Sequence, residues 1–138
     1  MKYSIVILLL LFFKVEAISQ CHSEANDVQC VERITAANKM VKSYKLDTYS
    51  SGDIEYSTVL VKDLRYYINL CEEGEVSNNV EINVYDTRRK LITSNKEGDQ
   101  SIQTELSFTC PKTGVYYLVF KRGEAPFSCG LGALSFSK

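Results

Sequence analysis

The stretch Thr104-Glu-Leu-Ser-Phe-Thr-Cys-Pro-Lys-Thr-Gly-Val-Tyr-Tyr-Leu-Val-Phe120 predicts a strand, a tight turn and a second strand. Polar and hydrophobic residues alternate from Glu105 to Cys110, which is the period of a half-buried strand. In Pro-Lys-Thr-Gly the proline cannot donate a ladder hydrogen bond and the glycine tolerates positive φ, so these residues favour a turn. Residues 115–120 are apolar or aromatic throughout, as expected for a strand covered on both faces. We therefore expect this hairpin to form the middle of a β-sheet core.

The same alternation extends outward from the hairpin in both directions. It predicts further strands over 41–48, 54–61, 64–71, 80–85, 90–94 and 130–137. Turn-forming residues separate these segments, and none of the connections has the length of a crossover helix. The pattern predicts an all-β fold, an antiparallel β-sandwich or jelly-roll of about eight strands, in one domain over residues 40–138.

The N-terminal residues have the order of a secretory signal peptide. Lys2 precedes an apolar run from Ile5 to Phe13, and small residues follow at Ala17 and Ser19. The run is shorter than the roughly 20 residues that span a bilayer, so we expect no membrane span in the mature chain. Residues 1–19 are therefore predicted to be a signal peptide, cleaved after Ala17 or Ser19, which places the protein outside the cytosol as a secreted or periplasmic, cell-envelope protein.

Residues 20–39 predict a disulfide loop with a short helical or irregular segment. Apolar residues recur every third position at Ala25, Val28, Val31 and Ile34, which favours a short helix. Inside one helix, Cys21 and Cys30 would lie about 13 Å apart along the axis, too far for a disulfide. Either the helix begins after Cys30 or these two cysteines do not pair. We favour a Cys21–Cys30 loop followed by one or two helical turns.

The chain has five cysteines and a single histidine, His22. The cysteines lack Cys-x-x-Cys spacing, so the pattern favours disulfides formed outside the cytosol over a zinc site. If the last six strands alternate in direction, Cys71 and Cys129 lie at the same end of the sandwich, which makes Cys71–Cys129 a candidate disulfide. Cys110 would lie at the opposite end as a buried free thiol. A Greek-key crossing would change this arrangement.

One family resemblance adds to these predictions. The run Phe108–Phe120, the Cys129-Gly130 pair, Tyr67–Cys71 and Val84–Asp86 together resemble small secreted bacterial proteins of unassigned function. The strand–Gly-x-Tyr-Tyr–strand pattern is more distantly similar to bacterial pre-peptidase C-terminal domains and to GOLD-type sandwiches. The resemblance covers residues 40–137 and implies an accessory or adhesion role. It implies no catalytic residues.

Tyrosines are the candidate ligand-facing residues of the predicted strands. Tyr66, Tyr67, Tyr85 and Tyr116 could form an aromatic platform for a glycan or a peptide. Adjacent tyrosines of a strand face opposite sides, so one member of each pair, Tyr66–Tyr67 and Tyr116–Tyr117, is expected in the core. The alternative for the outward members is cross-strand packing on the sheet surface.

Other chemistries have weaker support in the sequence. The formal net charge of −1 gives no electrostatic case for binding nucleic acid. The acidic loop Glu72–Asn79 carries oxygen ligands for calcium but lacks the alternating acidic spacing of a dedicated calcium loop, and a solvated loop is the alternative. A Cys110–His22 dyad is formally possible, although an inert buried thiol is the expected state of Cys110. No cofactor is expected.

These observations predict an exported, non-catalytic β-sandwich module with a binding, accessory or adhesion role. Its ligand would be a protein or a glycan. Two alternatives stay open: a structural, self-associating envelope protein, and a small secreted hydrolase that uses a pair of carboxylates.

Overall fold

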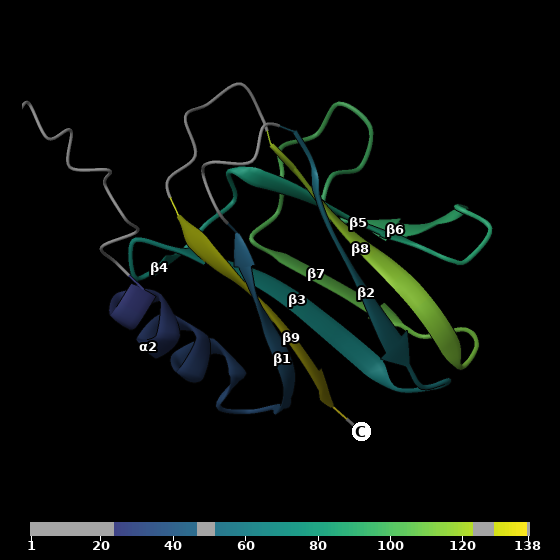
Figure 1. The fold of residues 1–138 in the computed structure, drawn as a ribbon, viewed down its shortest axis with the longest axis horizontal. Helices are drawn as coiled ribbons and strands as arrows, with labels where there is room; N and C mark the ends of the chain where they lie inside the picture. The colour runs from purple at the N-terminus through teal and green to yellow at the C-terminus, as the bar shows by residue number, and fades with distance from the viewer. Residues whose placement is uncertain (1–23, 47–51, 123–128, 138) are drawn as a thin grey trace, which may run out of the picture.

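The structure, a computed structural model, describes residues 24–46, 52–122 and 129–137. The predicted signal peptide 1–19, Cys21 and His22 lie outside these ranges. The described residues form one helix and nine strands (Figure 1). Their bounds are α2 (Glu24–Thr35), β1 (Lys39–Leu46), β2 (Ile54–Leu60), β3 (Arg65–Glu72), β4 (Glu75–Val76), β5 (Val80–Tyr85), β6 (Leu91–Ser94), β7 (Glu105–Thr109), β8 (Gly114–Arg122) and β9 (Gly130–Ser137).

The strands form two packed antiparallel sheets, which confirms the all-β sandwich predicted from the sequence. The five-stranded sheet has the order β1-β9-β3, and both β7 and β4 pair with the free edge of β3. The four-stranded sheet has the order β2-β8-β5-β6. The eight predicted strands all form, and β4 is an additional two-residue strand within the predicted acidic loop. Two residues are too few to show a period, so the alternation could not reveal β4.

The predicted hairpin is wrong, although both of its strands form. β7 pairs with β3 in the five-stranded sheet, whereas β8 pairs with β2 and β5 in the four-stranded sheet. The turn between β7 and β8 therefore crosses from one sheet to the other. The connection between β2 and β3 crosses in the same way beside it: the Asp63 N–H donates to the Cys110 carbonyl at 2.9 Å, and the Cys110 N–H donates to the Leu64 carbonyl at 3.0 Å.

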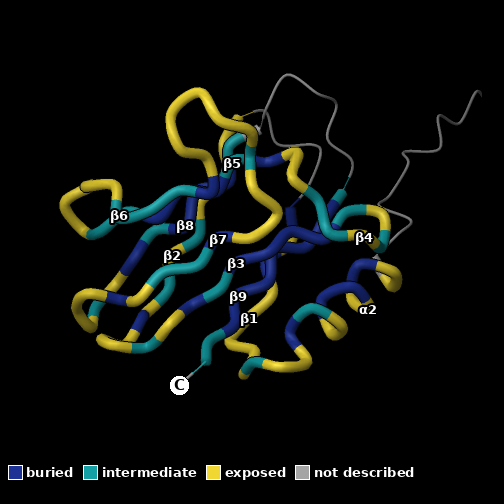
Figure 2. The backbone as a smooth tube through the Cα atoms, turned by 180° about the vertical axis from the view of Figure 1, so that it is seen from behind, coloured by how far each residue is buried: buried dark blue, intermediate teal, exposed yellow. Residues whose placement is uncertain are grey.

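The main core lies between the sheets and follows from the alternation of each strand. Tyr66, Ile68 and Leu70 of β3 point inward from one sheet, and the inward residues of β5 and β8 meet them from the other. Figure 2 shows the buried segments running through the middle of both sheets, with the exposed residues in the turns and along the outer strands. The fully buried members of this core include Tyr44, Leu46, Leu60, Val80, Ile82, Val84, Leu118, Phe120 and Leu134.

The helix α2 covers part of the outer face of the five-stranded sheet. Its inward stripe is Asp27, Cys30, Val31 and Ile34, which is the i, i+3, i+4, i+7 spacing of a helix packed on one side. Ala25 and Val28 of the predicted stripe are instead exposed. Below the helix, Cys71, Leu131 and Ala133 form a second, smaller apolar cluster with this stripe. Within the described ranges, no helix is long and apolar enough to cross a membrane.

Both predicted disulfides are wrong, because Cys30 is bonded to Cys71. The helix α2 begins before Cys30 and places this residue over β3, where the side chain of Cys71 points outward beneath the helix. Of the two alternatives left open for Cys21 and Cys30, the second holds. Cys129 is also disulfide-bonded, but not to Cys71. Cys110, the candidate free thiol, is buried and has no disulfide.

Candidate functional site

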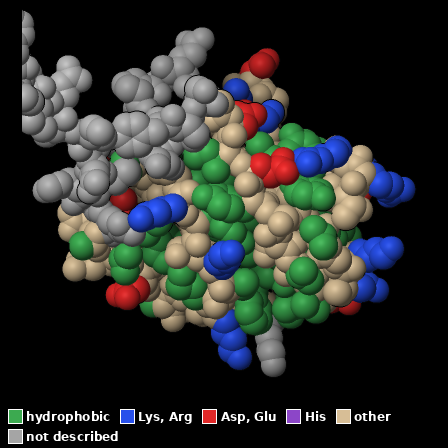
Figure 3. Space-filling view, in the orientation of Figure 1, with side chains coloured by type: hydrophobic (Ala, Val, Ile, Leu, Met, Phe, Trp, Pro, Cys, Tyr) green, Lys and Arg blue, Asp and Glu red, His purple; other side chains and the backbone are tan. Residues whose placement is uncertain are grey.

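Three turns meet at one end of the sandwich, which we call the turn end. They comprise residues 61–64, 86–90 and 110–113, and they carry five basic residues (Lys62, Arg88, Arg89, Lys90, Lys112) but only two acidic ones (Asp63, Asp86). The described turns at the opposite end, 72–79 and 95–104, carry five acidic residues (Glu72, Glu73, Glu75, Glu97, Asp99) and one lysine (Lys96). In Figure 3, Lys and Arg side chains gather along the right-hand margin, where Figure 1 shows the β5–β6 and β7–β8 turns. The described part of the molecule therefore carries its positive and its negative charge at opposite ends.

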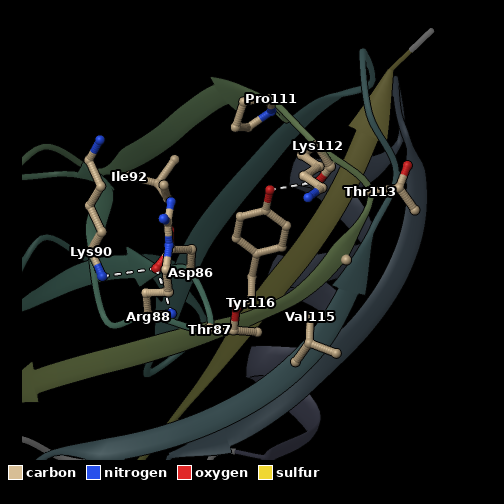
Figure 4. A pocket seen from close by; sticks show the side chains of 11 residues that line it. Asp86, Thr87, Arg88, Lys90, Ile92, Pro111, Lys112, Thr113, Val115 and Tyr116 are labelled. Atoms are coloured by element: carbon tan, nitrogen blue, oxygen red, sulfur yellow. Dashed lines mark hydrogen bonds and ion pairs between the residues drawn. The ribbon is translucent and has the colours of Figure 1, made fainter.

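The turn end contains a cleft of about 650 Å³ between the β5–β6 turn and the β7–β8 turn. Basic, hydroxyl and apolar side chains line it, and Figure 4 shows those of Arg88 and Lys90 on one side and that of Lys112 on the other. The full lining is Asp86, Thr87, Arg88, Lys90, Ile92, Pro111, Lys112, Thr113, Gly114, Val115 and Tyr116. We refer to it as the turn-end cleft.

Asp86 holds one wall of the cleft in shape. Its Oδ1 accepts the backbone N–H of Arg88 at 2.8 Å and that of Lys90 at 2.9 Å. The backbone of Arg89, between them, has a positive φ of 62°, which this turn requires. The hydrogen bond from the Lys90 N–H, followed by the bond from Arg88 and the nearby positive charges, lowers the pKa of the Asp86 carboxyl. Asp86 is therefore charged and engaged by the turn itself.

Tyr116 forms the floor of the cleft and joins it to the core. Its side chain is only 4 % exposed, and its hydroxyl donates to the Lys112 carbonyl at 2.6 Å (Figure 4). The Cys110 Sγ donates to the same carbonyl at 3.2 Å. Burial, with a smaller contribution from Cys110, raises the pKa of Tyr116 to about 12. The β7–β8 turn is therefore fixed from inside, which leaves the Lys112 side chain exposed above it.

The outer face of the four-stranded sheet adjoins the cleft. Tyr117 lies half-buried on this face, and the Arg89 guanidinium sits 4.1 Å above the centre of its ring. Arg89 also forms a bidentate ion pair with Glu55, at 2.6 and 3.1 Å. The exposed face of Tyr117 is thus already covered by a cation. Apolar side chains beside it are open to solvent, with Val59 62 % and Val115 40 % exposed.

The structure separates the four predicted ligand-facing tyrosines. Tyr66 is buried against Phe108 and Phe136, and its hydroxyl accepts the Val61 N–H at 2.9 Å. The prediction that Tyr66 faces a ligand is therefore wrong, because it is the inward member of its pair. Tyr116 is also the inward member of its pair and reaches the surface only as the cleft floor.

Tyr67 and Tyr85 point outward, as half-buried residues on opposite sheets. The Tyr67 hydroxyl is 3.3 Å from that of Ser137, and the Arg65 guanidinium lies 5.8 Å from the centre of its ring. Tyr85 is the register partner of Tyr117 on the four-stranded sheet. The four tyrosines do not form one platform.

The acidic loop Glu72–Asn79 satisfies much of its own hydrogen bonding. The Glu72 carboxylate accepts the Ser77 hydroxyl at 2.8 Å and the Asn79 amide at 3.0 Å. Glu75 lies 3.6 Å from Arg33 of the helix. No group of three or more His, Cys, Asp or Glu among the described residues is arranged to hold a metal ion.

The turn-end cleft itself was not visible in the sequence. Its basic residues come from turns more than twenty positions apart, and each turn alone reads as an ordinary polar loop. The available signal was that the turns 86–90 and 110–113 each carry more basic than acidic residues, whereas Lys62 and Asp63 balance in the turn 61–64. That signal needed the pairing of the sheets to place the turns at one end.

Comparison with known proteins shows likeness in fold alone. No protein-family model and no curated protein matches this sequence. Among solved structures, the fold is similar to the crystal structure of PliG from Aeromonas hydrophila, a periplasmic lysozyme inhibitor of g-type lysozyme. The similarity covers 74 % of this chain and 90 % of the PliG chain, with a TM-score of 0.50 and 16 % sequence identity.

Proposed function

We propose that this chain is an exported, non-catalytic binding protein whose partner is another protein, and that lysozymes are the partner class to test first. The observation that carries the proposal is the shared sandwich with PliG, over nine-tenths of that chain. PliG is a periplasmic inhibitor. A binding role for this chain agrees with the accessory or adhesion role that its more distant resemblance to pre-peptidase C-terminal domains implies.

Export is supported by two independent features. The N-terminal residues have the composition of a signal peptide. The Cys30–Cys71 disulfide is of a kind that persists in oxidising compartments such as the periplasm or the extracellular space. We propose a secreted or cell-envelope location on these grounds.

A non-catalytic role is supported by the causes of the shifted pKa values among the described residues. Catalytic groups are commonly titratable residues whose pKa values are shifted by one another within a cleft. Here the lowered pKa of Asp86 follows from backbone bonds of a turn, and that of Glu55 from its ion pair with Arg89. The raised pKa values of Tyr44 and Tyr116 follow first from burial. Each shift has a structural cause.

The proposal is tested with the purified exported chain and with lysozymes of the g, c and invertebrate types. We expect saturable binding to at least one of them by calorimetry, and loss of its activity on bacterial cell walls at stoichiometric amounts. Binding to none would remove lysozymes as partners. Cell-wall or peptide hydrolysis by the chain alone would overturn the non-catalytic assignment.

Self-association is a second candidate, favoured by the exposed Val59 and Val115 on the uncovered sheet face. A disulfide link through Cys110 does not support it, because this thiol is fully buried. Sedimentation at increasing protein concentration distinguishes the two candidates. A dimer that dissociates in the Val59→Lys variant would favour self-association, whereas a monomer at every concentration would exclude it.

A further inference from the structure

We propose that the turn-end cleft binds carboxylate groups on an acidic segment of the protein partner. This inference rests on the proposed function, which supplies a protein partner, and it names the chemistry by which that partner is recognised. It is carried by the charges of the cleft, by its lining and by the end-to-end polarity of the described residues.

The cleft has an excess of positive charge that is available to a ligand. The Lys90 and Lys112 side chains are exposed, and their ammonium groups form no ion pair with any described residue. Arg88 lies 3.8 Å from Asp86, but its side chain is 85 % exposed. Asp86 is the one acidic residue of the lining, and it already accepts two backbone N–H groups. The cleft therefore offers three cationic groups against one engaged carboxylate.

Apolar and hydroxyl side chains line the cleft between these charges. Ile92, Pro111 and Val115 provide apolar surface on which the methylene groups of Asp or Glu side chains can pack. Thr87 and Thr113 provide hydroxyl groups. Such a mixture suits a polypeptide that presents carboxylates, because it can pack aliphatic stems while the charges meet at the rim.

The lining of the cleft does not suit a site on which sugar rings stack. Carbohydrate rings stack on open aromatic faces, but Tyr116, the one aromatic residue of the lining, is 4 % exposed and its hydroxyl is bound to the Lys112 carbonyl. The neighbouring Tyr117 ring is covered by Arg89. The observations thus favour an acidic polypeptide over a glycan.

The separation of charge between the two ends of the molecule orients an approaching acidic partner. The turn end is basic and the described turns at the opposite end are acidic, so the field of the molecule draws a negatively charged segment toward the cleft. Association should therefore be faster and tighter at low ionic strength, where screening is weak.

The test uses an octaglutamate peptide as the probe, with octaglutamine, inorganic phosphate and a sulfated glycan as comparisons. Binding to the exported chain is followed by the amide chemical shifts of the protein in solution. We expect octaglutamate to shift the amides of residues 87–90 and 112–114, and octaglutamine to shift none. The octaglutamate effect should fade as salt is added.

Matched variants separate site binding from general charge attraction. Lys112→Glu should weaken octaglutamate binding about tenfold, because it removes one ion pair and adds a repulsion. Lys96→Glu makes the same charge change in a turn at the opposite end, and should change binding by less than about twofold. Equal effects of the two variants, or no localised shifts with octaglutamate, would overturn the inference. Binding of the sulfated glycan or phosphate in place of octaglutamate would overturn the choice of partner.

Failure of the inference and failure of the proposed function give different results. If a lysozyme binds and Lys112→Glu binds it equally well, the inference fails while the proposed function stands. If octaglutamate binds at the cleft but no lysozyme binds, lysozymes fail as partners while the carboxylate specificity of the cleft stands.

Discussion

At the scale of single residues, Tyr116 links the core of the sandwich to the cleft at its surface. It is the inward member of a tyrosine pair, yet its hydroxyl reaches the Lys112 carbonyl in the turn that crosses between the sheets. A side chain in this position serves two purposes: its ring fills the core, and its hydroxyl fixes the turn that carries one of the basic groups.

The raised pKa of Tyr116 predicts a loss of stability in alkali. The folded protein holds this proton up to a pKa of about 12, whereas an ordinary tyrosine releases it at 10.0. Between these pH values the unfolded chain binds fewer protons, so the free energy of unfolding falls as the pH rises. We expect urea denaturation to show this fall above pH 10, and Tyr116→Phe to reduce it.

Two comparisons make the Tyr116 prediction specific. At neutral pH, Tyr116→Phe should cost about 0.5–1.5 kcal/mol, because the hydrogen bond to the Lys112 carbonyl is lost. The variant should keep part of the alkaline fall, since burial also raises the pKa of Tyr44. A variant with the same pH dependence as the natural chain would contradict the assignment.

Gly74 is a residue where a side chain would be both strained and crowded. Its φ is 84°, and a Cβ atom would lie 3.1 Å from the Cβ of Asn26 in the helix α2. Gly98 also has a positive φ, of 56°, but a Cβ there would meet nothing within 4 Å. We expect Gly74→Ala to lower the free energy of unfolding by about 1–2 kcal/mol more than Gly98→Ala, which carries backbone strain alone. Equal losses in urea denaturation would show that the contact with Asn26 relaxes freely.

At the scale of secondary-structure elements, the helix α2 is attached to the five-stranded sheet by a disulfide, hydrogen bonds and apolar packing, besides the ion pair of Arg33 with Glu75. The Cys30–Cys71 disulfide joins it to β3, and the Asp27 carboxylate accepts the Gly74 N–H at 2.7 Å. Val31 and Ile34 pack on the apolar cluster below. The helix therefore covers the cluster around Cys71 that the sheet would otherwise expose.

Removal of this disulfide should destabilise the fold without changing its class. The bond closes a loop with a sequence separation of 41 residues. On the chain-entropy account such a loop contributes about 3–4 kcal/mol. We expect the double variant Cys30→Ala/Cys71→Ala to lose about that much, with the amides of α2 exchanging with solvent before those of the β-strands. Unchanged protection of α2 would show that its apolar contacts and Asp27 suffice to hold it.

At the scale of the whole molecule, the two sheets come into close contact where Gly132 of β9 faces Phe120 of β8. A Cβ added at Gly132 would lie 2.8 Å from the ring of Phe120, closer than real contacts allow. The glycine therefore sets the spacing of the layers at that point. Phe120 is itself buried, at 1 % exposed.

The tight contact between the layers predicts an overpacking effect. Gly132→Ala should lower the free energy of unfolding by about 1–3 kcal/mol. Adding Phe120→Leu to this variant should restore part of that free energy, because the smaller side chain relieves the clash. Gly114→Ala is the matched control, since a Cβ there meets nothing within 4 Å. Additive losses from Gly132→Ala and Phe120→Leu would contradict a direct clash.

Local patterns predicted the strands well because each strand's alternation is set by which of its own residues face the core. β5 and β9 have the predicted bounds, and the pairs Tyr66–Tyr67 and Tyr116–Tyr117 each place one ring inward. Pairing between strands was predicted poorly. The turn at residues 111–114 has the composition of a hairpin but crosses between sheets, because turn residues permit a change of direction without specifying the partner strand.

The sequence alone therefore determined the fold class, the positions of the eight predicted strands and the alternation of inward and outward side chains along them, since these depend on periods of neighbouring residues. The tertiary structure decided the Cys30–Cys71 pairing and brought the basic groups of separate turns together at one cleft. Both depend on which strands lie side by side and on where the helix packs. Those choices follow from contacts between residues far apart in the chain, and no local period records them.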